Sequence, residues 1–129
     1  MKTAVTVAQT LVRLCALVLI VLGVLFWTGN ARGLIPVHML VGVVLVLALW
    51  SLALLAARAG VSPGYVAFVF LWGLLVPTLG VTQDRLVPGS SHWLVQVLHL
   101  LVGLAAIGQA ENLAARTLRR RRAQEAEAA

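Results

Sequence analysis

Two stretches of the sequence share one pattern: His38-Met39-Leu40-Val41-Gly42-Val43 and His99-Leu100-Leu101-Val102-Gly103-Leu104. Each stretch lies inside a long apolar run, shortly after a predicted helix start. Residues four apart share one face of a helix, so each pattern places a glycine one turn deeper than its histidine. The repeated pattern therefore predicts two similar helices that each carry a histidine at a comparable depth.

The composition predicts that these helices lie in a membrane. Of the 129 residues, 61% are hydrophobic and only 11% are charged, and the mean hydropathy is +1.00. In a typical soluble domain roughly a quarter of the residues are charged. This chain therefore does not have the composition of a soluble domain. We expect an all-α integral membrane protein, multi-pass, in the plasma or inner membrane and in contact with the lipid bilayer.

Four apolar segments are long enough to cross a bilayer, which requires about 20 helical residues. We predict spans at about 5–28, 36–58, 63–83 and 91–113, with a basic cytoplasmic tail at 116–129 that extends the last helix. Residues 1–115 then form a four-helix transmembrane bundle, and the repeat favours two similar helical hairpins. The alternative is chance similarity, because Leu, Val and Gly are common in any apolar helix.

Capping residues and prolines give the expected helix starts. The candidates are Asn30 or Pro36 for the second span, Ser62 with Pro63 for the third, and Ser90 or Ser91 for the fourth. Two residues inside the spans are unusual. Pro77 predicts a bend in the third span. Arg13, in the first, either extends its side chain to the inner surface or takes part in a buried ion pair or a polar pathway.

The distribution of basic residues predicts the orientation of the chain, since cytoplasmic loops carry an excess of Lys and Arg. With both termini inside, eight basic residues face the cytoplasm and two face outward. The inner set is Lys2, Arg13, Arg58, Arg116 and Arg119 to Arg122, and the outer set is Arg32 and Arg85. Both termini are therefore expected in the cytoplasm, with His38 and His99 nearer the outer leaflet.

The histidine pair is the strongest candidate site, because an imidazole inside a membrane span is costly without a partner. Helices that start on the same side run parallel, so both imidazoles can bind one iron from opposite sides. Gly42 and Gly103 would leave room for a flat porphyrin, which predicts one haem b. The alternatives are close helix packing at the glycines, a cofactor-free contact of the histidines, another metal, or a proton relay.

Four further residues are candidates for binding the same cofactor. Gln96 lies one turn outward from His99 and is a candidate hydrogen-bond partner of that ligand. His92 lies two turns outward and is expected either at the interface or at a haem propionate. Arg32 and Arg85, the two outer arginines, are candidates for pairing with propionates, and the alternative is ordinary flanking charge.

The layout resembles the small four-helix membrane cytochromes b of the cytochrome b561 and haem A synthase kind. The resemblance covers the four spans, and its specific part is His38, Gly42, His99 and Gly103. It implies haem ligation by the two histidines. Those families commonly carry a second histidine pair toward the other face, and this sequence has no histidine in its inner half. A relay between two haems is therefore not expected.

The sequence predicts a single-haem membrane protein that exchanges electrons with a quinol or a redox partner, or that holds or senses haem. Whether it is an enzyme and whether it forms oligomers stay open. No nucleotide-binding or hydrolase pattern is present, and no aromatic residues interleave with the arginines as nucleic-acid binding would require. The alternative functions are a cofactor-free membrane subunit and a small transporter.

Overall fold

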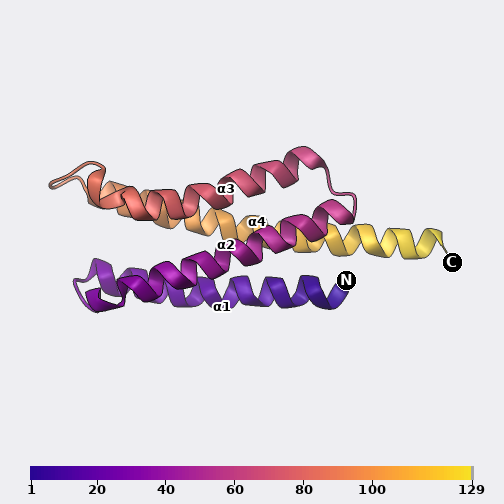
Figure 1. Cartoon of the computed structure of the whole chain (residues 1–129), viewed down its shortest axis with the longest axis horizontal. Coiled ribbons are helices and arrows are strands. Elements are labelled where there is room, and N and C mark those ends of the chain that lie inside the picture. The colour runs from indigo at the N-terminus through magenta and orange to yellow at the C-terminus, as the bar shows by residue number, and fades with distance from the viewer. Residues whose placement is uncertain (129) are drawn as a thin grey trace.

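The structure is a computed structural model that describes residues 1–128, and all the regular secondary structure in that range is helical. Its long helices are α1 (Lys2–Trp27), α2 (Ile35–Arg58), α3 (Pro63–Thr82) and α4 (Trp93–Glu127), and short 3-10 turns lie at η1 (Arg32–Leu34) and η2 (Gln83–Arg85). Figure 1 shows these helices as one elongated bundle. All four helices are long and apolar enough to cross a membrane. The prediction of an all-α chain with four apolar helices is therefore confirmed.

The two helices that carry the candidate histidines are the central pair of the bundle. α2 contacts α1, α3 and α4, and α4 likewise contacts the other three helices. Within the described residues, α1 and α3 make no contact with each other. Each helix therefore packs against its neighbours in the sequence, and α4 also packs against α1 and α2 (Figure 1).

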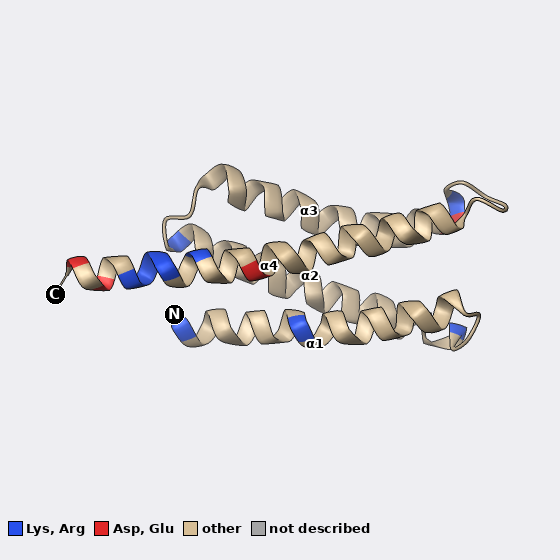
Figure 2. Ribbon diagram, turned by 180° about the vertical axis from the view of Figure 1, so that it is seen from behind, with Lys and Arg blue, Asp and Glu red and all other residues tan. Residues whose placement is uncertain are grey.

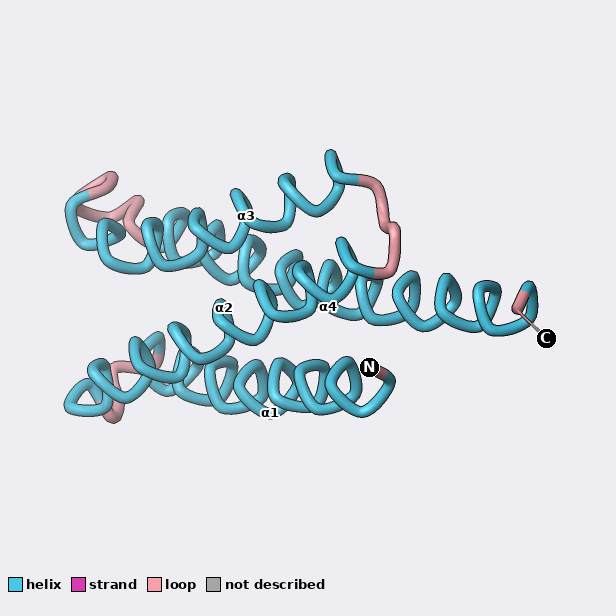
Figure 3. Tube along the Cα trace, turned by 45° about the vertical axis from the view of Figure 1, so that its right-hand side comes forward, coloured by secondary structure: helices cyan, strands magenta, loops and turns pink. Residues whose placement is uncertain are grey.

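The bundle has two chemically different ends. We call one the terminal end, because the start of α1 and the end of α4 lie there together with the turn at residues 59–62 (Figure 3). The Lys2 ammonium lies 2.8 Å from the Glu125 carboxylate and links the two chain ends. The opposite end carries the connections at residues 28–34 and 83–92, and we call it the histidine end. Figure 2 shows that most Lys and Arg residues gather toward the terminal end.

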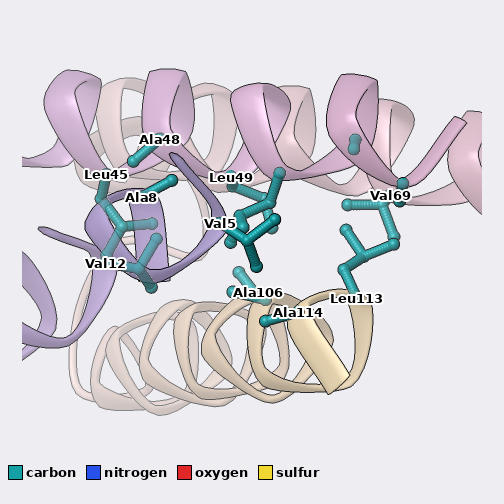
Figure 4. Close-up of a cluster of buried hydrophobic side chains, with 14 of the residues drawn as sticks. Val5, Ala8, Val12, Leu45, Ala48, Leu49, Val69, Ala106, Leu113 and Ala114 are labelled. Carbon is teal, nitrogen blue, oxygen red and sulfur yellow. The ribbon is translucent and has the colours of Figure 1, made fainter. Parts of the chain in front are cut away.

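Small residues form the core of the half nearer the terminal end. Ala53 and Ala56 of α2 and Ala106, Ala110 and Ala114 of α4 are fully buried. They pack with larger residues such as Val5, Leu49 and Leu113 (Figure 4). Alanines on facing helices let the backbones approach closely, as is typical of helix packing in membranes. This half of the bundle is therefore tightly packed.

The half nearer the histidine end is packed less extensively. Its buried cluster contains only Leu79, Val95 and Val102, with the partly buried Trp72 and Val76 against it. The Trp72 indole N–H donates a 3.0 Å hydrogen bond to the Val102 carbonyl and links α3 to α4. The candidate histidines lie in this less tightly packed half.

The helix starts agree with two of the three predictions. α3 begins at Pro63 with Ser62 as its N-cap residue, as expected. α2 begins at Ile35 with Pro36 in its first turn, so the proline start is the correct alternative. Asn30 instead donates from its side-chain amide to the Thr28 carbonyl at the end of α1.

The expected cap of the fourth span is wrong. α4 begins at Trp93 after His92, so neither Ser90 nor Ser91 caps it, because these serines lie in the preceding turn. α4 then continues as one helix to Glu127, so the described part of the basic tail is helical, as predicted.

The structure shows the surroundings of Pro77 and Arg13, the two residues that are unusual inside an apolar helix. α3 continues through Pro77 without interruption. Arg13 forms a two-point ion pair with Glu111 of α4, with Nε and one terminal nitrogen each 2.7 Å from a carboxylate oxygen. Gln9 donates to the same carboxylate at 2.6 Å. An ion pair of Arg13 is therefore present, but it is not the buried pair of the prediction, because 58% of the Arg13 side chain and 37% of the Glu111 side chain are exposed.

Candidate functional site

The structure brings His38 and His99 together between the central helices. Their ring centres are 6.5 Å apart, and the ring planes are inclined by 50°. Both residues are half-buried. Each stands six residues after the start of its helical segment, at Arg32 and at Trp93. α2 itself begins at Ile35, only three residues before His38, so the match in depth rests on the short distance between the two rings and not on the starts of the α-helices.

The two outer helices position these imidazoles. Phe26 of α1 packs on His38 in an edge-on arrangement, with ring centres 5.4 Å apart. Gly80 of α3 lies beside His99, since a Cβ atom on residue 80 would be 3.2 Å from His99 Cε1. Each of the four helices thus contributes one residue to the site. Neither Phe26 nor Gly80 was predictable from the sequence as part of this site, because neither is related to the histidines by helical periodicity.

The histidines carry polar atoms that the protein leaves unpaired. Nδ1 of His38 and Nδ1 of His99 are both buried and have no hydrogen-bond partner. A buried polar atom without a partner costs about 1–3 kcal/mol, so such atoms are rare and need an explanation. Gln96 forms no hydrogen bond with His99. Each imidazole therefore keeps one buried nitrogen that no described group of the protein engages.

Gly42 and Gly103 lie beside open space. A Cβ atom added to either glycine would meet no atom of another helix within 4 Å. Gly73 of α3 is different, because a Cβ atom there would collide with the Trp50 indole. Close helix packing therefore explains Gly73 but does not explain Gly42 or Gly103. Neither Gly42 nor Gly103 is therefore in close contact with a neighbouring helix.

The remaining candidates lie at the histidine end but outside the pair. Nδ1 of His92 lies 3.3 Å from the Leu86 carbonyl oxygen, in the connection that precedes α4. Arg32 belongs to η1 and Arg85 to η2, and both are exposed. None of these three side chains forms a hydrogen bond with His38 or His99 within the described structure.

The donor set of the site is two imidazoles. Residues 1–128 contain no group of three or more His, Cys, Asp or Glu side chains placed to hold a metal ion. Cys15 is buried in the α1 part of the core and belongs to the other half of the bundle. Two nitrogen donors are too few for a structural zinc site, which takes four ligands. They suit a cofactor whose macrocycle already supplies the other ligands of its iron.

Comparison with known proteins does not indicate a function for this chain. No protein-family model, no curated protein and no solved structure matches the chain. A fold such as a four-helix bundle supports many functions, so function has to be argued from the residues of the site. The resemblance to membrane cytochromes b stays a prediction that rests on His38, Gly42, His99 and Gly103.

Proposed function

We propose that the chain spans the plasma or inner membrane four times and holds one b-type haem between His38 and His99. The observation that carries the proposal is the pair itself, with ring centres 6.5 Å apart and a buried, partnerless nitrogen on each ring. The two imidazoles would hold the iron of the cofactor from two different helices.

The surroundings of the pair support a flat ligand. Gly42 and Gly103 leave the helix surface beside each imidazole open. Phe26 and Gly80 contact the rings from the outer helices and would fix their orientation. Arg32 and Arg85 lie at the same end of the bundle and would pair with the carboxylates of the cofactor. The two imidazoles, the open glycines and the two nearby arginines are the features that support the proposal of a haem.

The orientation follows from the positive-inside rule. The terminal end carries eight of the ten basic residues and is assigned to the cytoplasm. The histidine end then faces outward, and the haem lies near the outer leaflet. Haem iron supplies one-electron chemistry when bound. The chain would use it to exchange electrons with a quinol in the outer leaflet or with a redox partner at the outer surface.

Visible absorption of the purified full-length protein tests this proposal. Protein from haem-replete cells should be red, contain about one haem per chain, and show Soret and α bands that shift on reduction. Iron held by both histidines should give a six-coordinate, low-spin spectrum. A colourless protein that also fails to take up added haemin would overturn the proposal.

A further inference from the structure

A basic pocket lies at the terminal end, where the turn between α2 and α3 meets α4. Its volume is about 450 Å³. Arg116, Arg119 and Arg120 line it from α4, and Val61 and Ser62 line it from the turn. The three arginines occupy this position because residues three and four apart share one face of a helix. The pocket therefore concentrates positive charge at one point of the surface.

No carboxylate of the described chain neutralises these arginines. The two ion pairs within residues 1–128 involve Lys2 and Arg13 instead. Arg116 is held in place, because its Nε donates to Asn112 at 2.9 Å and its guanidinium lies 4.9 Å from the centre of the Tyr65 ring. Arg119 donates only a 3.4 Å hydrogen bond to the Ala115 carbonyl. Most of the guanidinium N–H groups therefore remain free to bind an anion.

Ser62 and the N-terminus of helix α3, which follows it, are two further features that suit an anion. It is the N-cap residue of the 20-residue helix α3, yet its hydroxyl forms no capping hydrogen bond. The hydroxyl is therefore available to a ligand. The N-terminus of a long helix carries partial positive charge and unpaired N–H groups, which favour phosphate.

An apolar groove begins at the same turn. It has a volume of about 550 Å³, and Val61 lines both the groove and the basic pocket. The groove follows α3 away from the terminal end, past Val66 and Ala67 to Phe70 and Leu71. A soluble anion would use the arginines but would leave this groove empty. A molecule with a phosphate and a hydrocarbon chain would use both.

We propose that these two adjoining surfaces bind one anionic phospholipid of the cytoplasmic leaflet. The phosphate lies among Arg116, Arg119 and Arg120, and one acyl chain lies in the groove along α3. Basic pockets between helices on the cytoplasmic side are a recognised form of lipid binding site. This inference rests on the membrane orientation given under the proposed function, and it is independent of haem.

Native mass spectrometry of the full-length protein in detergent tests the site. We expect one phosphatidylglycerol to be retained at about one tenth of the concentration needed for phosphatidylcholine with the same chains. Arg119→Gln and Arg120→Gln should each weaken retention about fivefold or more, because each removes charged hydrogen-bond donors. Arg122→Gln is the matched control, since Arg122 belongs to the same run of arginines but does not line the pocket. Equal losses in all three variants would show general attraction to anionic lipid and would overturn the site.

The groove is tested separately. Ala67→Trp fills the groove and should weaken retention of phosphatidylglycerol, whereas Ala105→Trp, on the exposed surface of α4, should not. Inorganic phosphate at millimolar excess should not displace the lipid. Full displacement by phosphate, with no effect of Ala67→Trp, would assign the pocket to a soluble anion. Recovery of the chain from the soluble fraction without detergent would instead refute the membrane proposal on which this one rests.

Discussion

The imidazole of His99 lies against the backbone of Gly80, so closely that a Cβ atom on residue 80 would be 3.2 Å from His99 Cε1. The contact joins α3 to the ring of a residue on α4. It limits where the ring can lie, because any side chain at position 80 would have to displace it. Gly80 is therefore a positioning residue for the candidate ligand His99.

Substitution of Gly80 should disturb the site in proportion to side-chain size. Gly80→Ala requires the ring to move by a few tenths of an ångström and should shift the absorption bands slightly. Gly80→Leu occupies the place of the ring and should lower the haem content about tenfold, as measured by haem extraction per protein chain. Gly108→Leu is the control, since nothing lies within 4 Å of a Cβ atom at residue 108. Equal haem content in both leucine variants would show that the contact does not position a ligand.

Gly103→Leu should separate folding from cofactor binding. No atom of another helix lies near a Cβ atom at residue 103, and leucine favours a helix over glycine by roughly 0.8 kcal/mol. The melting temperature of the haem-free protein should therefore stay equal or rise. The haem content should fall sharply, because the new side chain occupies the space assigned to the porphyrin. Retention of haem in this variant would remove Gly103 from the proposed site.

His38→Ala and His99→Ala should each remove one axial ligand. The bundle should persist, since its backbone hydrogen bonds are internal and its core lies mainly in the other half. The iron should become five-coordinate and high-spin, or haem should be lost. His92→Ala should keep the low-spin spectrum, because His92 lies in the connection near Leu86 and not in the pair. The reverse result would move the site to His92.

The ion pair of Arg13 with Glu111 should show non-additive behaviour. Glu111→Gln leaves Arg13 without its anionic partner and weakens the contact between α1 and α4, so the melting temperature in detergent should fall. The double variant Arg13→Gln/Glu111→Gln removes both charges and should melt above the Glu111→Gln variant. Additive effects of the two substitutions would show that the pair does not join the helices.

Reporter fusions check the orientation. A reporter fused after residue 129 should be active in the cytoplasm, and one inserted at Gly89, in the connection before α4, should behave as external. The opposite pattern would place the histidine end in the cytoplasm. It would also move the expected electron partner to the inner surface.

The sequence predicted the helices well because apolar length and prolines are local properties. Pro63 and Pro36 mark the starts of two helices in the structure, where a missing N–H group has no cost. Ser90 and Ser91 failed as caps because they lie in a turn that precedes α4, in which the His92 N–H donates to the Gly89 carbonyl. Boundaries inside polar loops are therefore less predictable than the spans themselves.

The contacts between helices were harder to predict from the sequence. The repeated pattern pointed to His38 and His99, since a repeat places equivalent residues at equivalent depth. Gly80 and Phe26 contact these rings from helices whose rotation the pattern does not determine. Glu111 was not assigned to Arg13 for the same reason, because the partners lie on the first and last helices.

The pairing of Arg13 with Glu111 also constrains the order in which the helices can assemble during synthesis. The two residues are 98 positions apart, so a ribosome adding about 5–20 residues per second needs about 5–20 s between them. During that interval the nascent first helix carries a guanidinium without its carboxylate. α4, the last helix to be synthesised, supplies the carboxylate of Glu111. The same helix also supplies Glu125, which pairs with Lys2 of α1. Assembly of this bundle is therefore completed by its last helix, and a chain that ends before residue 111 leaves Arg13 without its carboxylate partner.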